Sequence, residues 1–291
     1  MDVTIFGINL TLNPVAFTLP IGDGWPVHWY GIIIATGFML AVIYGMLNGK
    51  RLGVDTDRLI DVVIVATPVA ILCARLYYIL FDDSLTLADF FDFSNGGFSG
   101  LAIYGGVIGA FLSGGIMCYV RKVRVLSAFD LAAVGFLIGQ GIGRWGNFIN
   151  QEAFGVATGC DWSGMTSVNV EKVLGKGARA HPCFLYESIW CLTGALLLHI
   201  YSKKRSFEGQ IILGYCVWYG AGRMFIEQLR TDSLFLGGPF RISTLVSIVL
   251  FVGGIAATVY FKKKVSAKTE EYAPVFADAM DDEPIAESEE E

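Results

Sequence analysis

Long apolar stretches recur along the whole chain, and short polar segments separate them. A helix needs about 20 apolar residues to cross the hydrocarbon layer of a bilayer. Stretches of about this length lie near residues 29–48, 59–80, 101–119, 127–146, 183–201, 209–228 and 241–261. The pattern therefore predicts an all-α polytopic membrane protein with seven transmembrane helices.

The composition supports this interpretation and excludes an ordinary soluble domain. Of the 291 residues, 54% are hydrophobic and only 16% are charged, and the mean hydropathy is +0.56. Soluble domains average about 25% charged residues. The first basic residue is Lys50, so the N-terminus lacks the basic segment of a secretory signal, and we expect the first apolar stretch to remain in the protein.

Basic residues alternate between the two sides of the predicted bundle. They follow the first, third, fifth and seventh stretches, as Lys50, Arg51 and Arg58, then Arg121, Lys122 and Arg124, then Lys203, Lys204 and Arg205, and finally Lys262, Lys263 and Lys264. Loops rich in Lys and Arg face the cytoplasm. The N-terminus is therefore predicted outside and the C-terminus in the cytoplasm.

The remaining segments define the predicted domain organisation. The glycine-rich segment 147–182 is expected to form a small external head, and the acidic loop 82–100 an external arm. Residues 1–264 then form the membrane domain. Residues 265–291 carry ten acidic side chains and few large apolar ones, which predicts a disordered cytoplasmic tail.

The six cysteines lack the spacing of a metal site, and no metal or cofactor is predicted. Most of them lie within apolar stretches, where a thiol packs as a small hydrophobic group. Cys160 and Cys183 both fall on the side predicted to be external, so a disulfide bridge between them stays open.

Polar residues inside the fourth apolar stretch share one helix face. Gln140, Arg144, Asn147 and Gln151 are spaced by four, three and four residues. Glycines at positions 135, 139, 143 and 146 form a neighbouring small-residue face. Such small faces let helices approach closely in lipid, so a structural role for these glycines is as well supported as a functional one.

The sixth stretch repeats the arrangement with Arg223, Glu227 and Arg230 at positions i, i+4 and i+7. A structural Arg–Glu pair is the alternative interpretation. Further polar residues lie in or beside other stretches, namely His28, Tyr30, Arg75, Tyr104, Tyr186 and Glu187. With the predicted orientation all of them fall in the outer half of the membrane, and the inner half is nearly free of charge. Because arginine binds phosphate through two N–H groups at once, this asymmetry indicates a site for the headgroup of an anionic phospholipid.

The segment GRWGNFINQEAFG at 143–155 resembles the signature of the bacterial prolipoprotein diacylglyceryl transferases, Gly-Arg-x-Gly-Asn-Phe-x-Asn-x-Glu-x-x-Gly, at every fixed position. Supporting segments are HWYG at 28–31, GLAIYGGVIG at 100–109, HPCFLYE at 181–187 and GRMFIEQLR at 222–230. Together with the seven stretches, they cover nearly the whole chain.

The resemblance implies an enzyme of the bacterial plasma (inner) membrane. It would transfer the diacylglyceryl group of phosphatidylglycerol to the lipobox cysteine of a preprolipoprotein, form a thioether and release glycerol phosphate. The implied partners are these two substrates and membrane lipid, without a nucleic acid and without a cofactor.

The resemblance also implies roles for individual residues. The expected catalytic residues are Tyr30, Tyr104, Arg144, Glu152, Arg223 and Glu227. The residues expected to bind phosphatidylglycerol are His28, Gly143, Arg144, Gly146, Asn147, Arg223 and Arg230. Many family members carry His where this chain has Tyr104, and a phenol titrates far above an imidazole. The base that activates the thiol stays open among Glu152, Glu227, His28 and His181.

Three other functions compete with this interpretation. An anion transporter or channel would place polar residues in the cytoplasmic half, which the sequence lacks. An intramembrane protease would carry a G-x-S-x-G or HExxH motif, and neither is present. A membrane scaffold would use the same ion pairs for structure alone.

Overall fold

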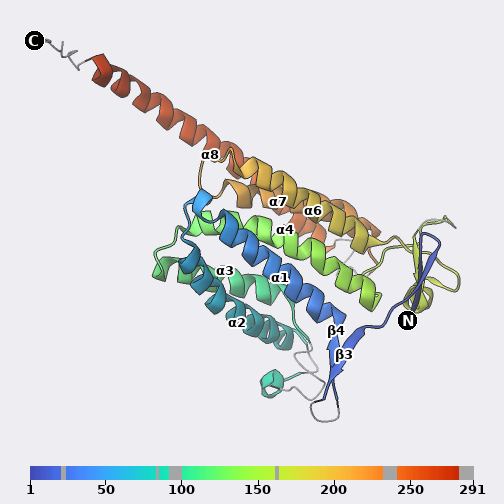
Figure 1. The fold of residues 1–291 in the computed structure, drawn as a ribbon. Coiled ribbons are helices and arrows are strands. Elements are labelled where there is room, and N and C mark those ends of the chain that lie inside the picture. The colour runs from blue at the N-terminus through green and yellow to red at the C-terminus, as the bar shows by residue number, and fades with distance from the viewer. Residues whose placement is uncertain (21–23, 83–84, 92–99, 161–163, 232–240, 282–291) are drawn as a thin grey trace, which may run out of the picture.

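The computed structural model describes residues 1–20, 24–82, 85–91, 100–160, 164–231 and 241–281. Long helices dominate it and lie side by side (Figure 1). They are α1 (Trp29–Asn48), α2 (Thr56–Leu80), α3 (Ile103–Val120), α4 (Val125–Asn150), α6 (Cys183–Ser202), α7 (Gln210–Leu229) and α8 (Ile242–Asp281). The hydropathy pattern thus placed each helix to within a few residues, apart from the C-terminal end of α8.

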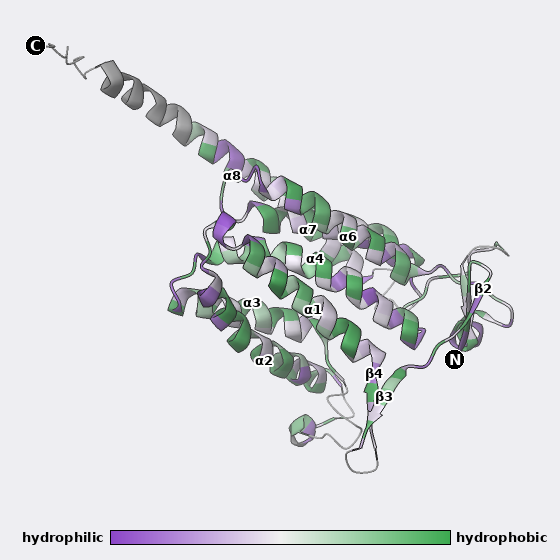
Figure 2. Ribbon diagram, in the orientation of Figure 1, coloured by the Kyte–Doolittle hydropathy of each residue, from purple (hydrophilic) through white to green (hydrophobic). Residues whose placement is uncertain are grey.

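Among the described residues, six helices are long and apolar enough to cross a membrane: α1, α2, α3, α4, α6 and the first 26 residues of α8. Large apolar side chains cover their outer surfaces, such as Leu112 and Ile116 on α3, which are both 63% exposed. Figure 2 shows the apolar colour along these helices, with polar residues mainly at their ends. This outward apolar surface fits a lipid environment, so the polytopic class is confirmed. Helix α7 is long enough but less apolar, and the count of seven spans stays a prediction.

Two small β-sheets lie at one end of the bundle, and the prediction of an all-α chain overlooked them. Strands β1 (Asp2–Ile5), β2 (Ile8–Thr11) and β5 (Met165–Ser167) form an antiparallel sheet in the order β2-β1-β5. Phe6 and Gly7 both have positive φ in the turn between β1 and β2, which matches a tight hairpin. Strands β3 (Val15–Leu19) and β4 (Trp25–His28) form a second hairpin that leads into α1. We call this end of the bundle the strand end.

The segment predicted as an external head joins this first sheet. It contributes β5 and the short helix α5 (Val168–Leu174), so the head is built from both the N-terminal residues and the 147–182 segment. Cys160 is exposed, Cys183 is buried and both are free, so the disulfide bridge that the sequence left open is not formed.

Of the predicted external arm, residues 82, 85–91 and 100 are described, and they include the 3-10 helix η2 (Leu87–Phe91). At the other terminus, α8 is helical through Asp281, so residues 265–281 of the tail expected to be disordered are helical in the structure. Alanine, lysine and glutamate after the apolar part favour continuation of the helix. Residues 282–291 lie outside the described part.

Glycine faces hold the helices together in antiparallel pairs. A Cβ atom added at Gly37 of α1 would lie 3.2 Å from the backbone oxygen of Gly139 on α4. On the α2–α3 pair, a Cβ atom at Gly105 would lie 2.4 Å from the backbone oxygen of Cys73. The structural interpretation of the small-residue face therefore accounts for the glycines of α4, because they allow α1 to approach.

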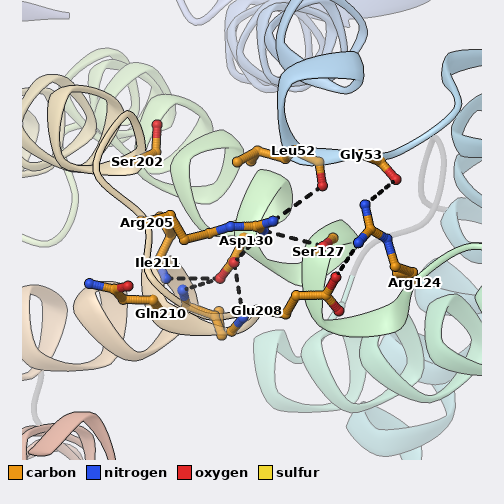
Figure 3. A network of polar contacts seen from close by, with 12 residues as sticks. Leu52, Gly53, Arg124, Ser127, Asp130, Ser202, Arg205, Glu208, Gln210 and Ile211 are labelled. Carbon is orange, nitrogen blue, oxygen red and sulfur yellow. Dashed lines mark hydrogen bonds and ion pairs between the residues drawn. The ribbon is translucent and has the colours of Figure 1, made fainter. Parts of the chain in front are cut away.

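A buried carboxylate joins α4 to α7 at the end opposite the strands (Figure 3). Asp130 of α4 is fully buried and accepts hydrogen bonds from the backbone N–H groups of Gly209, Ile211 and Ile212, each at 2.9 Å. Arg205 donates to the same carboxylate at 3.0 Å. The first N–H groups of a helix have no partner within the helix, so Asp130 satisfies those of α7 from a neighbouring helix. Asp130 lies in the half of the membrane that was predicted to be nearly free of charge, so that prediction is wrong at this position.

We predict that Asp130→Ala destabilises the protein by about 3–5 kcal/mol, because it leaves Arg205 buried without its carboxylate partner. Thermal unfolding in detergent measures the effect. The matched control is Asp61→Ala, which removes the same charge from an exposed pair with Arg121 and should cost about 0–1 kcal/mol. Equal melting temperatures for the two variants would contradict the proposed link between α4 and α7.

Candidate active site

The last turns of α4 bring three residues of the 143–155 segment together at the strand end. Arg144 donates to the side-chain oxygen of Asn147 at 3.3 Å, and the Asn147 amide donates to the carboxylate of Glu152 at 2.8 Å. Helix α4 ends where Gln151 adopts a positive φ of 55°, and Ala153 has the same φ. Left-handed backbone at non-glycine residues is strained and often marks a functional site. Glu152 lies between these two residues and is exposed.

The carboxylate of Glu187, on α6, is the centre of the site. It is 5% exposed, and three guanidinium groups converge on it. Its Oε2 atom lies 2.5 Å from Nη2 of Arg144, and its Oε1 atom lies 3.1 Å from Nη1 of both Arg223 and Arg230. Residues from α4, α6 and the end of α7 therefore meet at one buried acid.

A second buried carboxylate completes the cluster. Glu227 is 1% exposed, and its Oε2 atom lies 2.7 Å from Nη2 of Arg223, one turn earlier on α7. Arg241, just before α8, donates to the backbone oxygen of Glu227. We call the side chains of Arg144, Glu187, Arg223, Glu227 and Arg230 the arginine cluster. Its three guanidinium groups face two buried carboxylates, which leaves one positive charge for an anionic ligand.

Two tryptophans fix α6 against α7 beside the cluster. The indole N–H of Trp190 donates to the backbone oxygen of Trp218 at 3.0 Å, and that of Trp218 donates to the backbone oxygen of Trp190 at the same distance. The rings stack with centroids 4.4 Å apart. Gly194 and Gly222 lie against the rings and leave no room for a side chain. The pair therefore sets the register that places Glu187 opposite Arg223.

A small pocket opens between α6 and α7 at this point. Glu187 and Arg223 supply its charged atoms, and apolar and aromatic side chains supply most of its wall. Its lining residues are Glu187, Trp190, Cys191, Tyr219, Gly222, Arg223 and Ile226. The pocket therefore places two charged side chains among apolar walls.

The other residues expected at the site take different positions. Tyr30 of α1 lies beside the end of α4, because a Cβ atom at Gly146 would lie 2.7 Å from its ring. A Cβ atom at Gly143 would lie 3.1 Å from Ile34. Both glycines thus make room for α1, and this packing explains them without a ligand.

Tyr104 and Arg75 belong to the α2–α3 pair rather than to the arginine cluster. Tyr104 is 40% exposed, and its ring lies near that of Tyr77. Arg75 is buried and donates to the backbone oxygens of Asp89 and Gly100. Within the described residues, no hydrogen bond joins Tyr104 to the cluster, so the structure does not bring these two predicted parts of the site into contact.

The two candidate histidines also lie outside the cluster. His28 ends β4, precedes α1 and is exposed, and its side chain does not cap the helix. His181 lies 3.2 Å from the hydroxyl of Tyr186, measured from Nδ1.

With this geometry established, similarity to known proteins identifies the family. The family model for prolipoprotein diacylglyceryl transferase matches residues 14–260. The chain belongs to this family. The resemblance seen in the 143–155 segment is therefore confirmed over most of the chain.

Relatives named phosphatidylglycerol–prolipoprotein diacylglyceryl transferase agree with this membership. The one from Clostridioides difficile strain 630 is 41% identical over 256 residues, which cover 87% of this chain and 97% of the relative. The relative from Bacillus cytotoxicus is 40% identical, over 82% of this chain and 89% of its own length. The relative from Pediococcus pentosaceus is 39% identical, over 91% of this chain and 97% of its own length.

In this member of the diacylglyceryl transferase family, four residues of the arginine cluster were predicted as site residues from the sequence, and Glu187 was not. A signal was present, because Glu187 closes the HPCFLYE segment and was one of few acids within an apolar stretch. Its role depends on contacts with three arginines from distant parts of the chain, and no local pattern reveals these contacts.

We predict that Gly222→Ala destabilises the protein by about 1–3 kcal/mol, as overpacking usually does, and lowers activity. The added Cβ atom would lie 2.1 Å from Nε1 of Trp190, so α6 and α7 must separate beside the cluster. Thermal unfolding and turnover measure both effects. Gly253→Ala on α8 is the matched control, because its Cβ atom meets nothing within 4 Å. A Gly222→Ala variant as stable and active as that control would show that the Trp pair does not set the register.

Proposed function

We propose that this chain transfers the diacylglyceryl group of phosphatidylglycerol to the lipobox cysteine thiol of a preprolipoprotein. The reaction forms a thioether and releases glycerol phosphate, and it is the first step of bacterial lipoprotein maturation. Membership of the family and the names of its relatives support the reaction. Among this chain's own residues, the observation that best supports the reaction is the convergence of Arg144, Arg223 and Arg230 at one buried position.

The arginines bind the lipid phosphate. A guanidinium group offers paired N–H donors that match two oxygens of a phosphate, and it stays charged at every physiological pH. Arg144 and Arg223 come from different helices, so together they hold the phosphate from two sides. Asn147 orients Arg144 through its side-chain oxygen.

The chemical step exchanges one bond for another at the terminal glyceryl carbon. The thiolate sulfur of the lipobox cysteine forms a bond to this carbon, and the bond from the carbon to the phosphate oxygen breaks. The electron pair of the broken bond goes to that oxygen, so negative charge develops on the departing glycerol phosphate. Guanidinium groups already in place stabilise this charge in the transition state more than in the ground state.

Glu152 is the best-placed of the four candidates to accept the thiol proton. Its carboxylate is exposed and takes one hydrogen bond from Asn147, so an incoming thiol has access to it. Glu227 is buried and its carboxylate contacts Arg223, so an incoming thiol has less access to it. His28 is assigned to the headgroup region, and His181 is held by Tyr186.

Tyr30 and Tyr104 position the substrates rather than exchange protons with them. A phenol with a reference pKa of about 10 is almost entirely protonated at neutral pH. Tyr104 is exposed on α3, and we assign it to the glycerol headgroup or the thiol. Gly143 and Gly146 contribute indirectly, by letting Tyr30 lie against α4.

The protein spans the bacterial plasma (inner) membrane seven times, with α7 as the sixth span. At 20 residues α7 is about 30 Å long, which matches the hydrocarbon layer. Its Arg223 pairs with Glu187 of α6 instead of facing lipid. The basic clusters lie at the end opposite the strands, so the N-terminus is outside and the acidic residues 265–291 extend into the cytoplasm.

The test of this function is incubation of the purified protein with phosphatidylglycerol and a lipobox peptide. Mass analysis should find the peptide with one diacylglyceryl group in thioether linkage. Arg144→Lys keeps the charge but loses the planar pair of donors, and it should reduce product formation by more than about tenfold. No adduct with the wild-type protein would refute the transfer, and near-normal turnover of a folded Arg144→Lys variant would refute the phosphate contact.

For Tyr104→Phe we expect a moderate loss of rate and an unchanged pH profile. The loss is moderate because one neutral hydrogen bond contributes about 0.5–1.5 kcal/mol. The same peptide assay, run over a range of pH, measures both. Tyr104→His should be tolerated. A Phe variant that is slower than Glu152→Gln, with an intact fold, would assign the base to the phenol instead.

Cysteine labelling tests the orientation. In a Cys160→Ala background, a membrane-impermeant thiol reagent should label Asn9→Cys from outside intact cells and Ser266→Cys only after the cells are opened. Both positions are exposed. Labelling of both from the same side would overturn the proposed topology.

A further inference from the structure

The carboxylate of Glu187 takes up hydrogen-bond donors that a lipid phosphate would need. Both of its oxygens are occupied by arginines, Oε2 by Arg144 and Oε1 by Arg223 and Arg230. A carboxylate offers about four acceptor sites, and here at least three of them face guanidinium groups. Part of the positive charge of the cluster is therefore offset from within the protein.

A carboxylate and a phosphate present the same pattern to a guanidinium group. Each offers two oxygens on one central atom, with negative charge shared between them, and both accept parallel N–H donors. An arginine that binds one of them can therefore bind the other without rearranging its planar end. Glu187 and the lipid phosphate compete for the same donors.

We propose that Glu187 is an internal substitute for the lipid phosphate and a positioning residue for the reaction. This inference rests on the proposed function. In the unliganded protein Glu187 holds Arg144, Arg223 and Arg230 in the arrangement that the phosphate needs. When phosphatidylglycerol binds, the phosphate replaces Glu187 as the partner of Arg144. Arg223 and Arg230 keep their contacts with Oε1, and Arg223 faces the phosphate with its remaining N–H donors.

Arg144 is the arginine that exchanges partners, for two reasons. Its side chain is 23% exposed, compared with 15% for Arg223 and 10% for Arg230, so an arriving lipid reaches it first. Among the described contacts of Glu187, Arg144 is the one guanidinium partner of Oε2, whereas Arg223 and Arg230 share Oε1 and would have to be released together.

This arrangement predicts opposite effects on binding and on turnover. Without the charge of Glu187, the positive potential of the cluster is greater and no internal anion competes, so an anionic ligand binds more tightly. The three arginines also lose the anchor that orients them, so the transition state is stabilised less well. A residue that served only the fold would not tighten the binding of an anion.

The experiment uses the full-length protein in lipid nanodiscs and the variant Glu187→Gln, which keeps the shape of the side chain. Glycerol 1-phosphate, as a competitive inhibitor, is the probe for the headgroup, and inorganic phosphate is the probe for phosphate alone. We expect about tenfold tighter inhibition by glycerol 1-phosphate, a lower KM for phosphatidylglycerol, and a kcat that falls by about tenfold or more. Unchanged or weaker inhibition in the folded variant overturns the proposal.

Asp130→Asn is the matched control, because it removes a buried carboxylate from an arginine partner at the other end of α4. It should leave inhibition by glycerol 1-phosphate unchanged. If glycerol 1-phosphate inhibited this variant more tightly to the same extent, any loss of buried negative charge would tighten inhibition, and the proposal would fail. Tightening by inorganic phosphate but not by glycerol 1-phosphate would assign the site to free phosphate and would also contradict it.

A measurement on the wild-type protein covers the case in which Glu187→Gln does not fold. Infrared difference spectra of protein labelled with ¹³C-glutamate should show a shift of a carboxylate band on addition of glycerol 1-phosphate. The same shift should be absent from Glu187→Asp, which carries no label at this position. No shift in the wild type overturns the exchange. Since the infrared measurement needs no turnover, failure of this inference is distinct from failure to form the peptide adduct.

Discussion

One buried acid, Glu187, allows three arginines to lie together inside an apolar helix bundle. A guanidinium group without a partner is costly within a membrane, and three of them also repel one another. The contacts from Glu187 to Arg144, Arg223 and Arg230 remove both problems. They also join α4, α6 and the end of α7, so the same interaction that makes the site possible holds its helices together.

Two polar links determine how α4 and α7 lie relative to each other. Asp130 satisfies the first N–H groups of α7 at one end, and Arg144 meets Arg223 through Glu187 at the other. The two helices run in the same direction, and the two links lie at opposite ends of the pair. The relative position of α4 and α7 is therefore fixed at two points along their length. The stacked pair of Trp190 and Trp218 adds a third restraint, between α6 and α7. Such restraint suits a site that must hold donors ready for a developing charge.

The sequence predicted the helices well because membrane spans are a local property. A stretch such as 29–48 is apolar by itself, and α1 has the same limits. The strands at the N-terminus were missed because β1 pairs with β5, more than 150 residues away, and short strands carry little periodicity. The helical part of the tail was missed because composition alone favoured disorder.

The site was predicted in part for a similar reason. Arg144, Asn147 and Glu152 lie within one short segment, and the structure joins them by hydrogen bonds. Spacing on one helix likewise paired Arg223 with Glu227. The roles of Glu187 and Asp130 come from contacts between helices, which spacing does not encode. Tyr104 lies on another helix pair, so the family motif alone did not reveal its distance from the cluster.

The central claim is that the arginine cluster holds the lipid phosphate, and a direct measurement is dipolar recoupling between ³¹P of phosphatidylglycerol and ¹⁵N of labelled guanidinium groups in proteoliposomes. The account predicts clear ³¹P dephasing for a bound lipid in the wild-type protein. Most of this dephasing should disappear in a folded protein with Arg144→Lys and Arg223→Lys, which lacks two labelled groups of the cluster. Dephasing of equal size in both proteins would place the bound phosphate elsewhere and contradict the account.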